Sequence, residues 1–452
     1  MPIPTRFLAL LAASLFLALP VQANPFETTL KNGLRVIVKE DRRAPTVVHM
    51  AWYRAGSMDE VDGSSGLAHL LEHMMFKGTP SVGPGEFNKR VAAAGGRDNA
   101  FTSRDYTAYY QQVPKEKLEE MIGLEADRMR HLNVDPKEFE QEIKVVMEER
   151  RTRTDDNPHA KLFEQMNAVA LQAHPYRRPI IGWMNDLQNM TAADARAWYE
   201  QWYVPNNAYV VVVGDVDHQD VFRLAEKYYG ALEARALPPR RPLAEPEQSG
   251  LRRITVKAPA ELPMLAMGYK APALRDVLKD KDVYALEMLA AILDGYDAAR
   301  FGKHLVREQK IAVGASTSYD STARGPGMFY LYGSPAAGKT AADLEKALRA
   351  EISKIQREGV SEAEIKRAKA QLLAAQIYKL DSMQGQAMEI GGTEGVGLSY
   401  RDIDKMIEQI RRVTPEEVKA VALKYFGDDA LTIGVLDPQP LPGKPQAQKA
   451  AK

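Results

Sequence analysis

The stretch that decides the fold is "GLAHLLEHMMFKGT", residues 66–79, where His69, Glu72 and His73 interrupt an otherwise apolar run. The apolar spacing is typical of a helix, and positions i and i+4 of a helix lie on one face. His69 and His73 therefore point the same way. Two neutral imidazoles placed like this can both reach one zinc ion at about 2.0–2.1 Å.

Glu72 stands next to His73 and three residues after His69, near the expected metal without having to bind it. From there it could act as a general base on metal-bound water, whose pKa zinc lowers to about 7. The alternative is that the three polar side chains lie on a partly exposed helix face and hold no metal.

A third protein ligand is needed, because a catalytic zinc ion usually has three. The chain has no cysteine, so this ligand must be His, Asp or Glu. The capping pattern predicts a helix that begins at Pro136. It carries Glu142 and Glu149, which lie two turns apart on one face. The alternative is a solvated acidic face, which we accept for Glu148, so the residues alone leave the ligand open.

Two segments of the sequence suggest an internal repeat. Residues 190–213 and 413–435 share a threonine N-cap, an amphipathic helix, a polar turn and an apolar strand. Residues 65–78 have an apolar counterpart in 282–295 that lacks the His and Glu residues. The linker between the copies, 236–250, contains four prolines. We therefore expect two copies of one α+β domain, in which the polar set is not needed for folding.

The expected organisation of the chain follows from this repeat. Strands are predicted at 33–41, 46–58 and 106–114, from their β-branched and aromatic residues. The predicted boundaries are a signal peptide at 1–23, a zinc-binding domain at 24–235, the linker at 236–250, a homologous domain at 251–440 and a disordered tail at 441–452.

The N-terminus has the pattern of an export signal. Arg6 precedes an apolar run over 7–19, and Val21-Gln22-Ala23 offers small residues for cleavage after Ala23. The run is too short to span a bilayer comfortably, so we expect a cleaved signal and a periplasmic protein; the alternative is a retained anchor. Beyond it, no run is long enough for a transmembrane helix.

The composition is that of a soluble globular protein, with 45% hydrophobic and 27% charged residues among 452. Sixty basic residues balance sixty acidic ones, which gives no electrostatic argument for nucleic acid as a partner. The absence of cysteine excludes disulfides and thiolate metal sites.

With these motifs in place, the chain resembles the pitrilysin/insulinase family of zinc peptidases, especially its processing-peptidase branch, over nearly all of its length. The resemblance implies two homologous α/β-roll domains that form half of a clamshell, with one zinc ion per chain. It implies that Glu149, seventy-six residues after His73, is the third ligand and that Glu142 supports the site. It also makes residues 98–110 similar to a substrate-binding edge strand, with main-chain contacts at Asn99, Ala100 and Phe101.

One departure concerns the second domain. Family members carry an arginine and, seven residues later, a tyrosine that help to stabilise the developing oxyanion. Arg307 matches the arginine, but the tyrosine position falls at Val313 or Gly314, and Tyr319 is wrongly spaced. The resemblance therefore implies a heterodimer with a sibling subunit that supplies the Arg–Tyr pair. The alternative is a homodimer or a monomer in which Tyr319 or a water fills the gap.

The expected function is a periplasmic zinc metalloendopeptidase that hydrolyses peptides or unfolded polypeptide segments, with Glu72 activating a zinc-bound water. The alternative is a non-catalytic structural or assembly subunit of the same family. The complete set of His69, Glu72, His73 and Glu149 argues against that alternative, because a scaffold does not need it.

Overall fold

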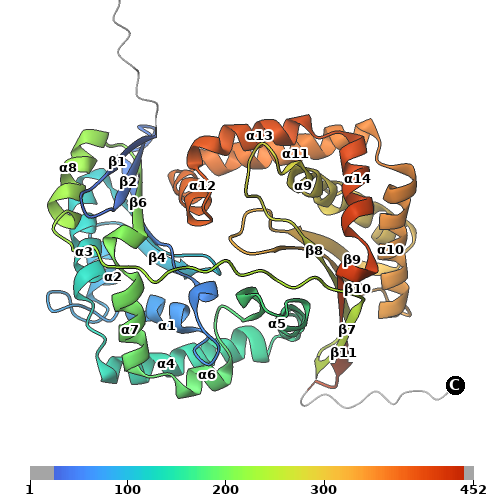
Figure 1. The fold of residues 1–452 in the computed structure, drawn as a ribbon, viewed down its shortest axis with the longest axis horizontal. Helices are drawn as coiled ribbons and strands as arrows, with labels where there is room; N and C mark the ends of the chain where they lie inside the picture. Colours follow the sequence, from blue (N-terminus) through green and yellow to red (C-terminus); the bar gives the residue numbers. More distant parts are fainter. Residues whose placement is uncertain (1–24, 442–452) are drawn as a thin grey trace, which may run out of the picture.

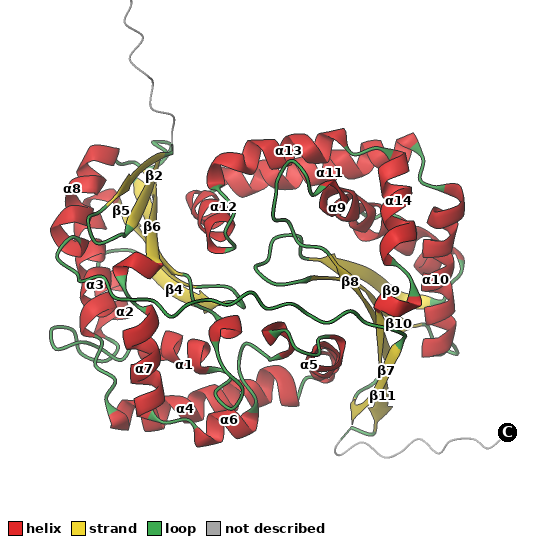
Figure 2. Cartoon of the chain, in the orientation of Figure 1, coloured by secondary structure: helices red, strands yellow, loops and turns green. Residues whose placement is uncertain are grey.

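The computed structural model describes residues 25–441 of the chain, shown in Figures 1 and 2. The predicted signal peptide and, except for residue 441, the predicted tail lie outside the described residues. The described chain forms two halves, each built on one β-sheet with helices packed on its faces. This mixture of sheets and helices confirms the expected α+β class.

The first half is built on a six-stranded sheet with the order β1-β2-β6-β3-β5-β4. Its strands are β1 (Phe26–Thr29), β2 (Arg35–Glu40), β3 (Thr46–Tyr53), β4 (Arg97–Thr102), β5 (Thr107–Pro114) and β6 (Ala208–Gly214). The second half has a five-stranded sheet with the order β7-β11-β8-β10-β9. Its strands are β7 (Arg252–Pro259), β8 (Met264–Ala271), β9 (Ala312–Tyr319), β10 (Gly327–Pro335) and β11 (Leu431–Gln439).

The two sheets repeat one topology. Strands β2-β6-β3-β5-β4 correspond in order to β7-β11-β8-β10-β9. Each series has one parallel pair at its start, β2 with β6 and β7 with β11, and antiparallel pairs after it. This shared order confirms the internal repeat that the sequence predicts.

Helices cover the faces of both sheets. Those of the first half are α1 (Leu67–Met74), α2 (Glu86–Ala93), α3 (Leu118–His131), α4 (Pro136–Arg150), α5 (Pro158–Ala170), α6 (Met184–Asn189), α7 (Ala192–Trp202) and α8 (His218–Tyr229). Those of the second half are α9 (Lys281–Asp294), α10 (Ala341–Glu358), α11 (Glu362–Asp381), α12 (Met383–Gly395), α13 (Ile403–Arg412) and α14 (Pro415–Tyr425). Among the residues described, none of these helices is both long and apolar enough to cross a membrane.

The two halves exchange one helix each. Helix α12 of the second half packs on β3 and β6 of the first sheet, whereas α5 of the first half packs on β7 and β11 of the second. Successive side chains of β6 point to opposite faces of the sheet, so the strand packs on both sides. Val210 and Val212 belong to the hydrophobic core of the first half. Val211 and Val213 belong to a second cluster, which includes residues of α12. The halves therefore interlock through two apolar interfaces.

The helix that was predicted to start at Pro136 is α4. The Asp135 side chain accepts hydrogen bonds from the N–H groups of Lys137 and Glu138, and proline occupies the first turn. The helix continues beyond Arg150 as a π-helical turn to Asp155, slightly further than the predicted end near 153. This cap fixes the register of the face that carries Glu142 and Glu149.

Candidate metal centre

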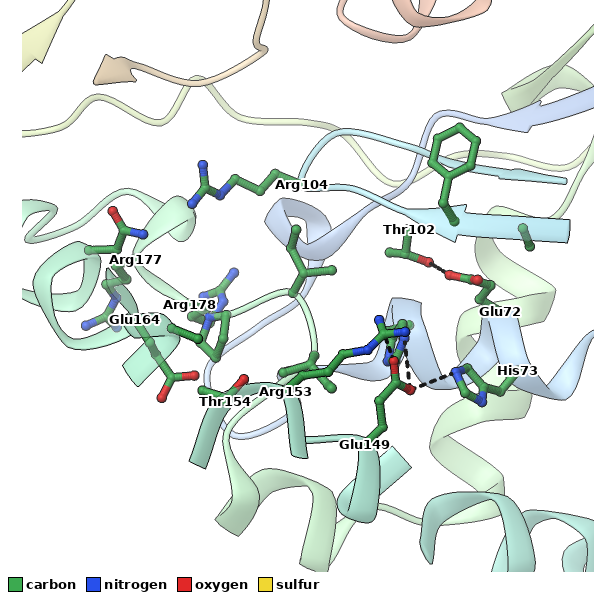
Figure 3. Close-up of a pocket in the computed structure, with 18 of the residues that line it drawn as sticks. Glu72, His73, Thr102, Arg104, Glu149, Arg153, Thr154, Glu164, Arg177 and Arg178 are labelled. Carbon is green, nitrogen blue, oxygen red and sulfur yellow. Dashed lines mark hydrogen bonds and ion pairs between the residues drawn. The ribbon is translucent and has the colours of Figure 1, made fainter. Parts of the chain in front are cut away.

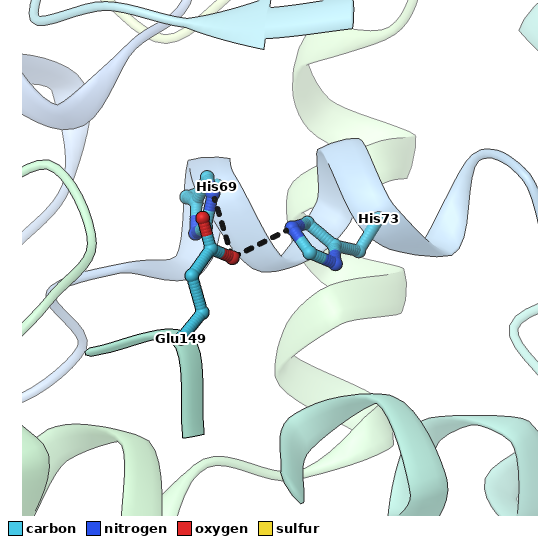
Figure 4. A group of neighbouring side chains, drawn as sticks. All are labelled: His69, His73 and Glu149. Carbon is cyan, nitrogen blue, oxygen red and sulfur yellow. Dashed lines mark ion pairs between the residues drawn. The ribbon is translucent and has the colours of Figure 1, made fainter. Parts of the chain in front are cut away.

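Helices α1 and α4 bring three polar side chains together. Nε2 of His69 lies 3.8 Å from Oε2 of Glu149, and Nε2 of His73 lies 3.3 Å from the same oxygen. Figure 4 shows both rings turned toward that carboxylate. The structure thus places the two histidines of the opening motif and the glutamate seventy-six residues later at one point.

This group fits a zinc ion by spacing and by chemistry. Two ligand atoms at about 2.0–2.1 Å from a tetrahedral ion lie about 3.4 Å apart, close to the observed Nε2–Oε2 distances. One ligand atom from each of the three residues lies within 4.8 Å of the others. Two imidazoles and one carboxylate form a donor set used by catalytic zinc sites, which keep a fourth position open.

The start of α1 is fixed by its neighbours. Gly66, its N-cap, has a φ of 89°, and a Cβ there would come within 2.6 Å of the Ile181 carbonyl oxygen. The buried carboxylate of Glu60 accepts hydrogen bonds from the N–H groups of Gly66 and Ala68 at 3.0 and 2.9 Å. These contacts hold the turn that precedes both histidines.

Glu142 supports the second histidine from behind. Its Oε1 lies 2.8 Å from Nδ1 of His73, and its other carboxylate oxygen pairs with Lys77. An N–H on Nδ1 that donates to Glu142 leaves the lone pair of Nε2 facing Glu149. A metal-binding Nε2 requires this tautomer, and the contact fits the supporting role that the resemblance implies for Glu142.

Burial and neighbouring charges act in opposite directions on the groups of this site. Burial, and then the neighbouring His73 and Arg153, lower the pKa of His69 to about 3, so its ring is neutral. Burial also opposes protonation of His73, but its hydrogen bond to Glu142 and the nearby carboxylates raise its pKa. Burial would raise the pKa of Glu142, yet hydrogen bonds from His73 and Lys77 outweigh it and lower that pKa. The neighbouring carboxylates thus favour positive charge at His73, whether a proton or a bound cation.

Glu72 lies beside this group and is held by strand β4. The hydroxyl of Thr102 donates to Oε2 of Glu72 at 2.5 Å, as Figure 3 shows. Burial raises the pKa of Glu72, and the hydrogen bond from Thr102 acts in the opposite direction. One carboxylate oxygen is therefore oriented by the strand, and Oε1 remains for a proton.

A cavity of about 650 Å³ joins these elements. Its lining includes His69, Glu72, His73 and Glu149 on one side and Asn99–Thr102 of β4 on the other. Strand β4 ends the first sheet, because β5 is the only described strand that pairs with it. The residues expected to contact substrate, Asn99, Ala100 and Phe101, thus lie on an edge strand in the same cavity.

Arg307 is not brought to this cavity. It lies in the π-helical segment Phe301–Glu308, and its Nη2 donates to the carbonyl oxygen of Asp297 at 2.8 Å. The hydroxyl of Tyr319 donates to the carbonyl oxygen of Pro272 at 2.6 Å, also outside the cavity lining. A catalytic role for Arg307 therefore stays a prediction that depends on a second chain.

Several residues of the site were not predicted from the sequence. Thr102 orients Glu72, Lys77 pairs with Glu142, and Glu60 caps α1. Arg153 pairs with Glu149 at 2.6 Å and follows it by four residues, a helical spacing that could have revealed it. The contacts of Thr102 and Glu60 depend on tertiary packing and leave no local signal.

Comparison with known proteins agrees with this geometry. Residues 35–183 match a family model described as "Insulinase (Peptidase family M16)", and residues 189–372 match one described as "Peptidase M16 inactive domain". The zinc protease PqqE of Helicobacter pylori is 34% identical over 418 residues, which cover 91% of this chain and 92% of that protein.

Solved structures show the same likeness. The crystal structure of a protease from Helicobacter pylori has a TM-score of 0.87 and 32% identity, covering 91% of this chain and 99% of that one. The periplasmic protease PqqL from Escherichia coli has a similar fold, with a TM-score of 0.79 and 20% identity over 92% of this chain and 48% of that one. The chain therefore belongs to the insulinase family (peptidase family M16), and it is a zinc metallopeptidase.

Proposed function

We propose that this protein is a periplasmic zinc metalloendopeptidase that cleaves peptides or unfolded polypeptide segments in the cavity between α1 and β4. The observation that carries the proposal is the convergence of both histidine Nε2 atoms on one Glu149 oxygen, at 3.3 and 3.8 Å, in the cavity that Glu72 also lines. A structural subunit would have no need of this arrangement.

The residues have distinct tasks in this mechanism. His69, His73 and Glu149 would hold zinc, which when bound polarises the scissile carbonyl and lowers the pKa of water to about 7. Glu72 takes a proton from the attacking water at Oε1 and later passes it to the leaving amine. Thr102 keeps the carboxylate of Glu72 aimed during both transfers.

The edge strand decides the class of substrate. A peptide that adds to β4 must present extended main-chain N–H and C=O groups, which a folded protein keeps in its own secondary structure. The cavity is lined by the sheet edge and by α1, so a chain that pairs with β4 lies next to Glu72. Peptides and unfolded segments meet this requirement.

Two further parts of the proposal have indirect support. The apolar run at 7–19 and the periplasmic location of PqqL favour export to the periplasm. The missing tyrosine at Val313 or Gly314 favours a heterodimer with a sibling chain. This chain also spans about half the length of PqqL, which leaves room there for a second unit of similar size.

The test uses an unfolded, internally quenched peptide mixture and a folded protein of similar composition. Zinc-loaded protein should cleave the peptides and not the folded protein, and a chelator should stop cleavage until zinc returns. Glu72→Gln should keep its zinc and lose about 10²–10⁴-fold in rate, because an amide cannot accept the proton. A Glu72→Gln variant with wild-type turnover would show that another group is the base.

A further inference from the structure

Arg104 stands at one end of the cavity and has no role in the mechanism above. It follows β4 by two residues and lines both the 650 Å³ cavity and a neighbouring one of about 340 Å³. Figure 3 shows its side chain extending from the end of β4 toward the end of the cavity where Arg177 and Arg178 lie. Its guanidinium is therefore available to a peptide that lies along β4.

The position of Arg104 is set before any substrate arrives. The N–H of Met58 donates to its carbonyl oxygen at 2.9 Å. The next residue, Asp105, is buried and accepts hydrogen bonds from the hydroxyl of Tyr176 and the N–H of Arg324. The guanidinium carbon lies 5.1 Å from the centre of the Tyr176 ring, a favourable cation–π arrangement. These contacts restrict the conformations of Arg104, so binding of a ligand would cost little additional conformational entropy.

The other arginines of the cavity already pair with carboxylates of the protein. Arg177 and Arg178 both pair with Asp62, at 2.6 and 2.8 Å. Arg153 pairs with Glu149 at 2.6 Å. These three cations therefore already have carboxylate partners.

Arg104 differs from them. Its guanidinium has no carboxylate partner among the described residues, although its buried Nε lacks a hydrogen-bond acceptor just as Nε of Arg177 and of Arg178 does. Asp320 lines the neighbouring cavity and feels the charge of Arg104, but the two form no ion pair in the part of the chain that the structure describes. A bound carboxylate could supply the partner that the guanidinium lacks.

Arg104 lies beyond the end of β4, in the bend that follows Thr102, and Thr102 holds the carboxylate of Glu72. A peptide that pairs with β4 and is cleaved beside Glu72 therefore continues past Thr102 toward Arg104, within a few residues of the scissile bond.

We propose that Arg104 forms a subsite for a carboxylate of the substrate, a few residues from the scissile bond on one side of it. This inference rests on the proposed peptidase function and adds a substrate class to it. The carboxylate belongs to an aspartate or glutamate side chain, or to the C-terminus of a short peptide. Guanidinium binds either with two parallel hydrogen bonds, which gives geometric as well as charge selectivity.

The test compares amidated peptides of one sequence in which a single glutamate is moved from three residues before to three residues after the scissile bond. Each has a glutamine and a lysine counterpart. A second arm compares short peptides with free and amidated C-termini, which separates the two sources of carboxylate. Zinc-loaded wild type, Arg104→Gln, Arg104→Glu and the matched surface control Arg223→Gln are assayed after equal zinc content is verified.

At one of these positions, glutamate should raise kcat/KM about 10- to 100-fold over glutamine in wild type and in Arg223→Gln. Arg104→Gln should abolish this preference, and Arg104→Glu should favour lysine at the same position. A free C-terminus that alone shows the effect would assign the subsite to terminal carboxylates. A preference for carboxylates that is absent in wild type, or unchanged in Arg104→Gln, would overturn the inference.

Binding separates this inference from the proposed function. The same labelled peptides are titrated against zinc-loaded Glu72→Gln, with and without Arg104→Gln, by fluorescence anisotropy. Wild type that cleaves no peptide would contradict the proposed function. A carboxylate preference in binding that depends on Arg104 would still support the subsite, and binding without that preference would overturn it.

Discussion

Oε1 of Glu142 lies 2.8 Å from Nδ1 of His73, on the side of the ring opposite the nitrogen that faces Glu149. The two glutamates come from one face of α4, so a single helix supplies both the carboxylate at the centre and the one that orients its neighbour. The seven-residue spacing between them therefore has a direct structural purpose.

Replacing Glu142 should weaken metal binding without removing a ligand. Glu142→Gln loses the negative charge shared with His73 and Lys77, so zinc affinity should fall about 10- to 100-fold. Competition with a zinc chelator of known affinity measures this change. Glu140→Gln, an exposed position on the same helix, is the control and should bind zinc as wild type does. Equal affinities for both variants would show that Glu142 does not orient the ligand.

Removing the hydroxyl that holds Glu72 should change the pH dependence of hydrolysis. The hydrogen bond from Thr102 lowers the pKa of Glu72, so Thr102→Val should raise it. A base works only when deprotonated, and the acid limb of the kcat/KM profile should therefore move to higher pH. The profile of the variant is measured against wild type from pH 5 upward. A limb that stays in place, or moves down, would contradict this role for Thr102.

Glu60 should matter for stability more than for chemistry. The two carboxylate oxygens of Glu60 accept hydrogen bonds from two backbone N–H groups in a buried position. In Glu60→Gln the side-chain N–H₂ replaces one of these oxygens, so one backbone N–H group loses its acceptor. The loss should be about 1–3 kcal/mol in the free energy of unfolding. Denaturant unfolding of the metal-free protein measures it. An unchanged midpoint would mean that α1 does not depend on this cap.

The partner prediction concerns Tyr319. Its hydroxyl is used by the Pro272 carbonyl, outside the cavity, so Tyr319→Phe should leave the rate of peptide cleavage unchanged. If a sibling chain supplies the missing oxyanion donor, adding it should raise the rate by about 10²–10³-fold. The heterodimer would be excluded by three results together. The lone chain would have full activity, the sibling would not change that activity, and Tyr319→Phe would abolish it.

The repeat and the ligand helix were predictable because they depend on local spacing. Histidines four apart share a helix face wherever the helix lies, and the threonine-capped helix before β6 has the same pattern before β11. The ligand on α4 was different. Its two-turn spacing allowed Glu149 without selecting it, and only the resemblance to a family did so.

The exchange of α5 and α12 was not predictable from the same patterns. An apolar helix face indicates that the helix will be buried, but it does not say which sheet covers it. Leu162 and Met166 of α5 pack against strands of the second sheet, nearly a hundred residues later in the chain. The contact between Thr102 and Glu72 and the unpartnered state of Arg104 are also products of tertiary packing. Sequence spacing alone contains neither.

The most direct test of the metal centre compares two neighbouring glutamates of α4. Glu149 faces both histidines, whereas Glu148 is exposed and pairs with Arg151 at 2.7 Å. Zinc content is measured by elemental analysis after dialysis of Glu149→Gln and Glu148→Gln against a weak chelator. Glu148→Gln should retain one zinc ion per chain, and Glu149→Gln should bind zinc at least about 100-fold more weakly. Equal zinc content in the two variants would contradict the site described here.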